Sequence, residues 1–243
     1  MTEYAVKEGE HVDFLRAGRH IIQKQKGFKF GIDAVLLADF AKPKKKDALC
    51  DLCSGGGIVP VLLSGRARRI VGVELPDEYV DMGNRSIKAN GLSDTKLLQG
   101  DLREIEKLLP VASFDVVTVN PPYLKEGGGE MSLFDEINIA KQEICLKIED
   151  VARAGAHLLI PNGRLYMVHR PDRLCDIFCA LRAENLEPKR VRMVYPAKGK
   201  PPSLILIEAR LSGLAGILFE APLIVMEDGE ETAEIKEIYG GRE

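Results

Sequence analysis

Asp47-Ala48-Leu49-Cys50-Asp51-Leu52-Cys53-Ser54-Gly55-Gly56-Gly57 is the stretch that decides the fold. Its mostly apolar first half predicts a buried strand, and its three glycines allow the backbone to approach a ligand closely. The apolar residues from Ile58 to Leu63 then predict a helix whose free N–H groups open onto the glycine loop. A strand, a glycine loop and a helix in this order are typical of doubly wound α/β folds.

Two further predicted strands end in acidic residues. The strand Ile70 to Val73 is followed by Glu74, which lies 23 residues after Asp51. That spacing is near the ~20 residues at which an acid binds ribose hydroxyls in dinucleotide folds. A third strand, Lys96 to Gln99, leads into Gly100-Asp101. Because the carboxyl ends of parallel strands meet at one crevice, we expect the glycine loop, Glu74 and Asp101 to lie together.

A fourth strand, Phe114 to Val119, ends in Asn120-Pro121-Pro122-Tyr123. Two consecutive prolines stop the strand and display these groups at its carboxyl end. The Asn120 Oδ1 atom and the Pro121 carbonyl can each accept a hydrogen bond from an –NH2 group, and Tyr123 can stack on the plane that carries it. Accepting hydrogen bonds from those N–H groups keeps electron density on nitrogen, which helps it attack an electrophilic methyl. The alternative is an ordinary proline-rich turn.

The ordered set of motifs resembles the class I S-adenosylmethionine-dependent methyltransferases, and Asn120 to Tyr123 resembles the motif of their amino-methylating branch. The flanking segments are similar to those of the bacterial tRNA-valine adenine N6-methyltransferases. These segments are Ile21-Ile22-Gln23, Gly27 to Ala38, Val168 to Leu174, Pro188 to Val191 and Pro222 to Gly240. The resemblance extends from about Ile21 to Gly240.

The resemblance implies S-adenosylmethionine as cofactor and an adenine of tRNA, beside the anticodon of a valine tRNA, as substrate. It implies that Glu74 binds the ribose of the cofactor, that Asp101 accepts from its adenine amino group, and that Leu102 lines the adenine pocket or belongs to the ordinary core. The remaining cofactor residues would be Phe28, Phe30, Asp33, Asp51, Cys53, Gly55, Gly57 and Asn120. The adenine would be turned out of its stack, and the catalytic group would be Asn120, Pro121, Pro122 and Tyr123.

Two positions depart from the family pattern. Cys53 stands where the glycine loop more often has its first glycine, and we expect a small residue to be tolerated there. Gln142 occupies a position where relatives often have histidine, while Lys141 and Glu143 keep the basic and acidic character of that segment.

We predict a Rossmann-like methyltransferase fold with a seven-stranded, mainly parallel sheet, an antiparallel last strand and helices on both faces. Residues 1–243 would form a single domain, with residues 1–30 as an N-terminal extension that contains a hairpin around Arg19 to Phe30. A loop at Gly127 to Gly129 would cover the substrate or act as a simple connector. Further strands are expected at Leu49–Leu52, Arg164–His169, Pro188–Val194 and Ser203–Leu211. Further helices are expected at Asp33–Phe40, Asp77–Asn90, Arg103–Leu109, Asp135–Ala154 and Pro171–Ala183.

The first ten residues lack the apolar core of a signal peptide, and no run approaches the ~18 apolar residues of a membrane span. We therefore expect a cytoplasmic monomer that has no contact with a membrane. Four cysteines form two close pairs, which could in principle hold zinc; we expect reduced core cysteines and no metal. The pairs are Cys50 with Cys53 and Cys175 with Cys179.

Charge is unevenly distributed along the chain. The formal net charge is −3, yet the acidic tail of residues 220–243 alone carries −6 and the rest of the chain +3. Basic clusters that could contact tRNA phosphates are Lys24 to Lys29, Lys42 to Lys46, Arg66 to Arg69 and Lys189 to Lys200. Each cluster could equally be a solvated surface.

Three other enzymes and one non-enzyme share parts of the pattern. A protein-glutamine N5-methyltransferase uses the same Asn-Pro-Pro-Tyr motif on a carboxamide, but carries a helical docking domain for which this chain has little room before the glycine loop. An rRNA guanine N2-methyltransferase usually ends the motif in Phe. An NAD-binding oxidoreductase would leave Asn120 to Tyr123 without a role, and an intact site argues against a non-catalytic adaptor.

Overall fold

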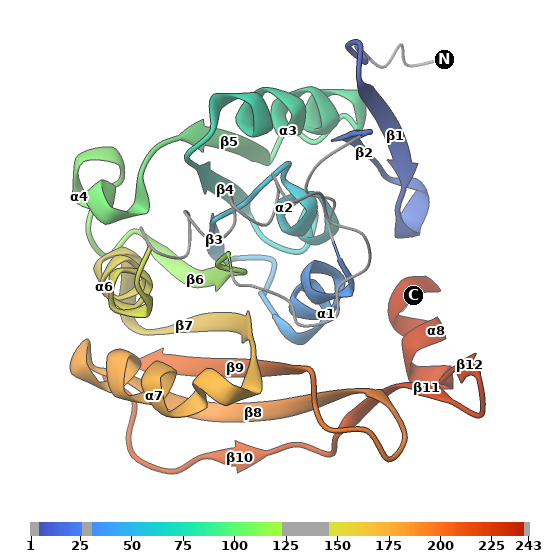
Figure 1. Cartoon of the computed structure of the whole chain (residues 1–243). Helices are drawn as coiled ribbons and strands as arrows, with labels where there is room; N and C mark the ends of the chain where they lie inside the picture. Colours follow the sequence, from blue (N-terminus) through green and yellow to red (C-terminus); the bar gives the residue numbers. More distant parts are fainter. Residues whose placement is uncertain (1–4, 26–30, 123–145, 241–243) are drawn as a thin grey trace.

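The computed structural model describes residues 5–25, 31–122 and 146–240. Within these ranges a ten-stranded sheet runs through the centre of the molecule, with helices on both faces (Figure 1). In sheet order the strands are β12 (Glu230–Glu231), β11 (Leu223–Glu227), β8 (Leu186–Ala197), β9 (Leu204–Leu211), β7 (Leu159–His169), β6 (Phe114–Val119), β3 (Ala48–Leu52), β4 (Arg69–Glu74) and β5 (Thr95–Gln99). The short strand β10 (Leu218–Phe219) pairs with β8 beside this path.

The helices form two layers because the strands are apolar on both faces. Neighbouring residues of β6 show this: Val116 packs toward α1 (Ile32–Phe40) and α2 (Ile58–Leu63), whereas Val117 packs toward the opposite layer. That opposite layer contains α4 (Ile105–Leu108), α6 (Ile148–Leu158) and α7 (Leu174–Ala183). Helix α3 (Asp77–Ala89) packs against β5 and α2.

The predicted mainly parallel sheet is confirmed. Strands β3 to β7 pair in parallel, and β9 lies antiparallel between β7 and β8. The seven predicted strands are β3 to β9. The predicted number of strands was too low, because the segment after β9 adds β10, β11 and β12 to the sheet.

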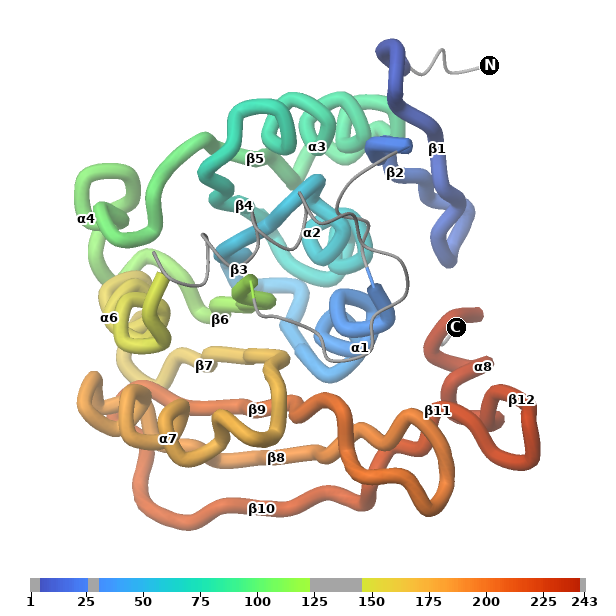
Figure 2. Tube along the Cα trace, in the orientation of Figure 1, coloured from blue at the N-terminus to red at the C-terminus, as the bar shows by residue number. Residues whose placement is uncertain are grey.

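The C-terminal segment is folded, although its acidic composition suggested a tail. Its last helix, α8 (Ala233–Gly240), buries Ile235 and Ile238 in the same core as α1. Figure 2 shows the trace passing from β11 and β12 into α8 at the end of the sheet. The many acidic residues of this segment gave no indication that one side of the helix is apolar and buried.

Two predicted boundaries were wrong. The N-terminal hairpin pairs β1 (Glu10–Phe14) with β2 (His20–Lys24), earlier in the chain than the predicted Arg19 to Phe30, of which residues 26–30 lie outside the described ranges. Helix α6 begins at Ile148 after an N-cap at Lys147, so the predicted helix from Asp135 does not run through residues 146 and 147. Its predicted portion before residue 146, like the loop at Gly127 to Gly129, lies outside the described ranges.

Candidate active site

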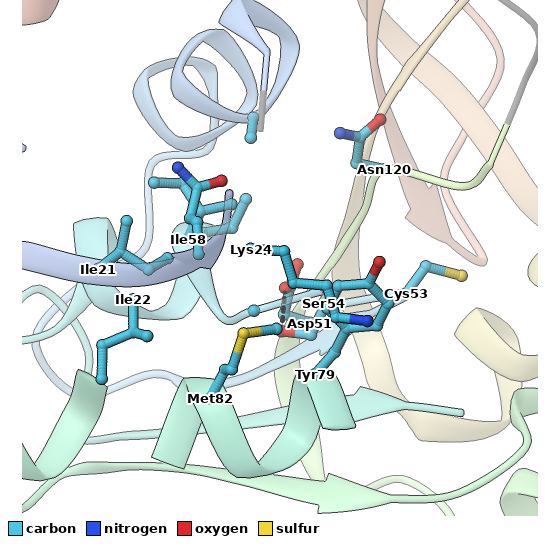
Figure 3. A pocket seen from close by; sticks show the side chains of 15 residues that line it. Ile21, Ile22, Lys24, Asp51, Cys53, Ser54, Ile58, Tyr79, Met82 and Asn120 are labelled. Carbon is cyan, nitrogen blue, oxygen red and sulfur yellow. Dashed lines mark hydrogen bonds between the residues drawn. The ribbon is translucent and has the colours of Figure 1, made fainter. Parts of the chain in front are cut away.

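A pocket lies at the carboxyl ends of β3 and β6 and is bordered on one side by β2 (Figure 3). Of the predicted site residues it contains Asp51, Cys53, Gly55 and Asn120. The remaining lining residues come from β2, from the helices around it and from the glycine loop. They are Ile21, Ile22, Gln23, Lys24, Ala34, Ser54, Gly56, Ile58, Val59, Tyr79 and Met82.

Asp51 connects the glycine loop to the strand that leads into Asn120. Its side chain is almost completely buried, and it accepts hydrogen bonds from Ser54 Oγ (2.7 Å) and Thr118 Oγ1 (2.6 Å). Burial raises the pKa of Asp51 to about 7, although the two hydroxyl donors act in the opposite direction. Asp51 therefore fixes the relative positions of the loop and of Asn120.

This burial predicts a pH-dependent stability difference between the wild type and Asp51→Asn. Because the pKa of Asp51 is higher in the folded than in the unfolded chain, the ionised carboxylate destabilises the folded state as pH rises from about 4 toward 7. The neutral amide lacks this penalty. The unfolding free energy of Asp51→Asn, relative to wild type, should rise by about 2–4 kcal/mol between pH 4 and pH 8 in urea titrations. A difference that stays constant with pH would contradict the assignment.

The glycine loop turns sharply and is fixed to the next strand. Cys53, Gly55 and Gly57 all have positive φ angles, of 55°, 53° and 85°. Cys53 is therefore a side-chain-bearing residue in a backbone region that favours glycine, which explains why glycine is the more usual residue there. The Ser54 N–H donates to the carbonyl of Val73 in β4 (3.1 Å), and α2 begins directly after Gly57.

Glu74 holds this loop from the end of β4. Its carboxylate accepts the Gly55 N–H (2.6 Å) and the Leu75 N–H (2.8 Å), while burial raises its pKa. The adjacent Leu75 side chain is 51% exposed, which is unusual for leucine and presents an apolar surface beside the carboxylate. Leu75 could not be recognised from the sequence, because only its exposure distinguishes it from a core leucine.

Asp101 lies at the same edge, after β5, but its carboxylate already has a partner. Arg103 donates to it through Nε (3.0 Å to each oxygen) and through its backbone N–H (2.9 Å), and this arginine holds the pKa of Asp101 below its usual range. Leu102 is buried in the core cluster that contains α4 and α6. Neither Asp101 nor Leu102 lines the pocket around Asp51.

Asn120 is half-buried at the end of β6 and lines the pocket (Figure 3). Pro121 is buried and Pro122 half-buried behind it. Asp33 is buried in the first turn of α1, next to the lining residue Ala34. The predicted residues Phe28, Phe30, Tyr123 and Gln142 lie outside the described ranges.

The wall formed by β2 is held against α3 by polar side chains. The Ile22 N–H donates to Ser86 Oγ (2.9 Å), and the Asn90 amide bonds both the N–H and the carbonyl of His20 (3.0 and 2.7 Å). Lys24 extends from β2 to Glu78 (2.6 Å) and lies over the Tyr79 ring (5.3 Å). The resemblance included residues of β2 but gave them no role, because their contacts are with a helix more than fifty residues away.

Gly83 of α3 lies directly against the glycine loop. A Cβ atom at this position would come within 2.9 Å of the Gly56 carbonyl oxygen and 2.6 Å of Leu97 Cδ2. Gly83→Ala should therefore displace the loop, destabilise the fold by about 1–3 kcal/mol and weaken cofactor binding. Urea unfolding and calorimetry test this, with Gly240→Ala as control because nothing lies within 4 Å of a Cβ there. Equal stability of the two variants would contradict this packing.

The predicted basic cluster at the end of the sheet is largely neutralised. Arg190 lies 3.8 Å from the centroid of the Phe40 ring, and Lys189 donates to two backbone carbonyls. The acidic C-terminal segment supplies most of the other partners. The ion pairs are Arg190 with Glu208 and Glu220, Arg192 with Glu234, and Lys198 with Glu227. Arg190 and Arg192 are thus held in partly buried ion pairs, which argues against phosphate contacts by these two arginines, whereas the Lys198–Glu227 pair is exposed.

No three metal-ligating side chains gather anywhere in residues 5–25, 31–122 and 146–240. Cys50 is buried in β3, whereas Cys175 and Cys179 are exposed on α7. In the part of the chain that the structure describes, no helix is both long and apolar enough to cross a bilayer.

No family model matches the chain. It is similar to two curated proteins named tRNA1(Val) (adenine(37)-N6)-methyltransferase. One, from Porphyromonas gingivalis, is 27% identical over 192 residues, which are 75% of this chain and 74% of the relative. The other, from Histophilus somni, is 28% identical over 174 residues, 66% of this chain and 71% of the relative.

Solved structures share the fold. One, from Agrobacterium tumefaciens, described as a predicted O-methyltransferase, superposes with a TM-score of 0.71 at 22% identity and covers 86% of this chain and 96% of its own. TrmN from Thermus thermophilus gives a TM-score of 0.54 at 17% identity, covering 73% of this chain and 48% of that one.

Fold and comparisons together define the class: the protein is a class I methyltransferase, a class whose methyl donor is S-adenosylmethionine. Within this class, its sequence is related to the bacterial tRNA1(Val) (adenine(37)-N6)-methyltransferases, as the motifs predicted.

Proposed function

We propose that the protein methylates the exocyclic N6 atom of an adenine in tRNA, in the anticodon loop of a valine tRNA. The observation that carries this proposal is the position of Asn120. It lies at the end of β6, half-buried, in the same pocket as the glycine loop. An acceptor for an amino group and a cofactor loop thus share one cavity. The names of the sequence relatives support tRNA as the substrate.

The pocket fits the proposed cofactor in its chemistry. The glycine loop brings backbone atoms to the pocket. Glu74 and Leu75 do not line the pocket, but Glu74 bonds the Gly55 N–H of the loop and offers carboxylate oxygens for ribose hydroxyls, and the exposed Leu75 offers an apolar surface for an adenine ring. When bound, S-adenosylmethionine supplies an electrophilic methyl group. Asp51 then serves as a positioning residue, because it braces the loop against the strand of Asn120.

The role of the chain is mainly to orient the reacting nitrogen. The Asn120 Oδ1 atom and the Pro121 carbonyl would accept hydrogen bonds from the two N6–H groups and hold the nitrogen toward the glycine loop. Tyr123 would stack on the base. Among the described lining residues Asp51 is the one carboxylate, and it is engaged by two hydroxyls, while Lys24 is paired with Glu78. The proton therefore leaves to water after transfer.

The substrate class is tested by competition. The enzyme is incubated with radiolabelled cofactor, total tRNA and a cell protein extract together. Label should enter tRNA and not protein. Label in protein and none in RNA would favour a glutamine methyltransferase and overturn the RNA assignment, while the methyltransferase fold would stand.

A further inference from the structure

Seven cations form a surface at the amino-terminal ends of the central strands β3 and β4, on the side of the sheet opposite the active site. We call them the basic edge: Lys42, Lys44, Lys45, Lys46, Arg66, Arg68 and Arg69. They lie in the two loops that lead into β3 and β4 and on the first residue of β4. Because these strands are parallel neighbours, both loops open at their amino-terminal ends, whereas the glycine loop and Asn120 lie at the carboxyl ends. The five residues of β3 separate the two edges by about 16 Å.

The two loops of the basic edge are tied to each other. The Arg68 N–H donates to the Asp47 carbonyl (2.9 Å), and Arg68 Nε donates to the Lys46 carbonyl (2.9 Å). Arg69 lies over the Phe114 ring, 5.0 Å from its centroid. The cations are thus presented on a fixed backbone, which lowers the entropy lost when a ligand binds.

The basic edge is not neutralised by acids. None of its seven side chains has a carboxylate within salt-bridge distance among the residues that the structure describes. The nearby acids already have other donors: Asp47 pairs with Arg164, and Asp94 accepts from Ser64 and from the Gly65 N–H (2.8 Å). Asp115 accepts the N–H of Ala48 (2.8 Å). The contrast with the paired cluster around Arg190 is direct, since there the C-terminal segment supplies partners.

We infer that the basic edge is a remote docking surface for the phosphate backbone of folded RNA. The inference rests on the proposed function and adds a second contact region to it. A concentrated positive surface on a chain of net charge −3 selects a polyanion with regularly spaced charges. Phosphate contacts position a nucleic acid without reading its sequence, and duplex RNA is recognised largely in this way. In this arrangement the anticodon loop would enter the pocket while a more distant part of the same tRNA contacts the basic edge.

The test compares two triple variants that lose the same charge. The first variant removes three exposed cations of the basic edge by the substitutions Lys44→Gln, Lys45→Gln and Lys46→Gln. The second, control variant removes three lysines elsewhere, two of which are paired with acids, by the substitutions Lys198→Gln, Lys200→Gln and Lys236→Gln. Binding of full-length tRNA and of an isolated anticodon stem-loop is measured by fluorescence anisotropy at several salt concentrations, alongside KM and kcat for methylation.

The basic-edge variant should bind full-length tRNA about 10-fold more weakly at low salt, with a salt dependence that is shallower by about two to three counterions. Its affinity for the stem-loop, its kcat and its cofactor affinity should equal those of wild type, and the control variant should match wild type throughout. Equal tRNA affinity of the two variants, or an equal loss on tRNA and stem-loop, would overturn the inference. Unchanged tRNA binding with lost binding to anionic phosphatidylserine vesicles would assign the surface to a membrane instead. Failure of the wild type to methylate any tRNA, by contrast, would overturn the proposed function itself.

Discussion

Asn120→Ala is expected to lower turnover by about 100-fold or more, because it removes the acceptor that orients the attacking nitrogen. The side chain lies at the end of β6 on the pocket wall and makes no hydrogen bond that supports the described fold. Cofactor affinity and the free energy of unfolding should therefore stay close to wild type. Single-turnover methylation with saturating cofactor measures the chemical step directly. Transfer at a near-normal rate would remove Asn120 from the catalytic group.

Glu74→Ala is expected to weaken cofactor binding by about 1–3 kcal/mol, roughly 5- to 150-fold, because charged hydrogen bonds are lost. The same substitution also frees the Gly55 N–H that fixes the glycine loop. Calorimetry with S-adenosylmethionine gives the affinity.

Glu74→Gln separates the two roles of this side chain. Its amide oxygen can still accept one of the two backbone N–H groups, so Glu74→Gln should lose less stability than Glu74→Ala while affinity falls. An unchanged affinity in both variants would contradict the role of Glu74, and tight binding of NAD in place of S-adenosylmethionine would contradict the class of site.

The local order of strands, loops and helices was predictable because each is encoded within a few residues. The strand of Asp51, the glycines after it and the helix from Ile58 to Leu63 were placed correctly by apolar runs and glycines alone. Two prolines likewise marked the end of β6 after Val119. Parallel pairing then brought the ends of these strands to one edge, as expected.

Contacts between distant segments were not predictable in the same way. Nothing in the residues around Ile22 shows that its N–H is accepted by Ser86, so the role of β2 as a pocket wall was missed. The acidic residues after Glu220 suggested a tail, because composition does not reveal that Glu234 pairs with Arg192 or that Ile238 is buried. The pairing of Asp101 with Arg103 was missed for a different reason: the resemblance already assigned that carboxylate to the cofactor.

The same limitation affects the basic clusters. Their sequences look alike, yet Lys198 is paired with Glu227 while Lys44 and Lys45 face solvent without an acidic partner among the described residues. Only the tertiary structure distinguishes cations that stabilise the fold from cations that are available to a ligand. The cations of the basic edge are therefore without an acidic partner among the described residues, and the arginines of the Lys189 to Lys200 cluster are not.

We propose that this pocket methylates the N6 atom of adenine in tRNA. The most direct test is to incubate valine tRNA lacking the modification with the enzyme and cofactor carrying a deuterated methyl group, then to digest the RNA and identify its nucleosides by mass spectrometry. We predict deuterated N6-methyladenosine, absent when Asn120→Ala replaces the wild type. Deuterium in N2-methylguanosine, or in no nucleoside at all, would contradict the account.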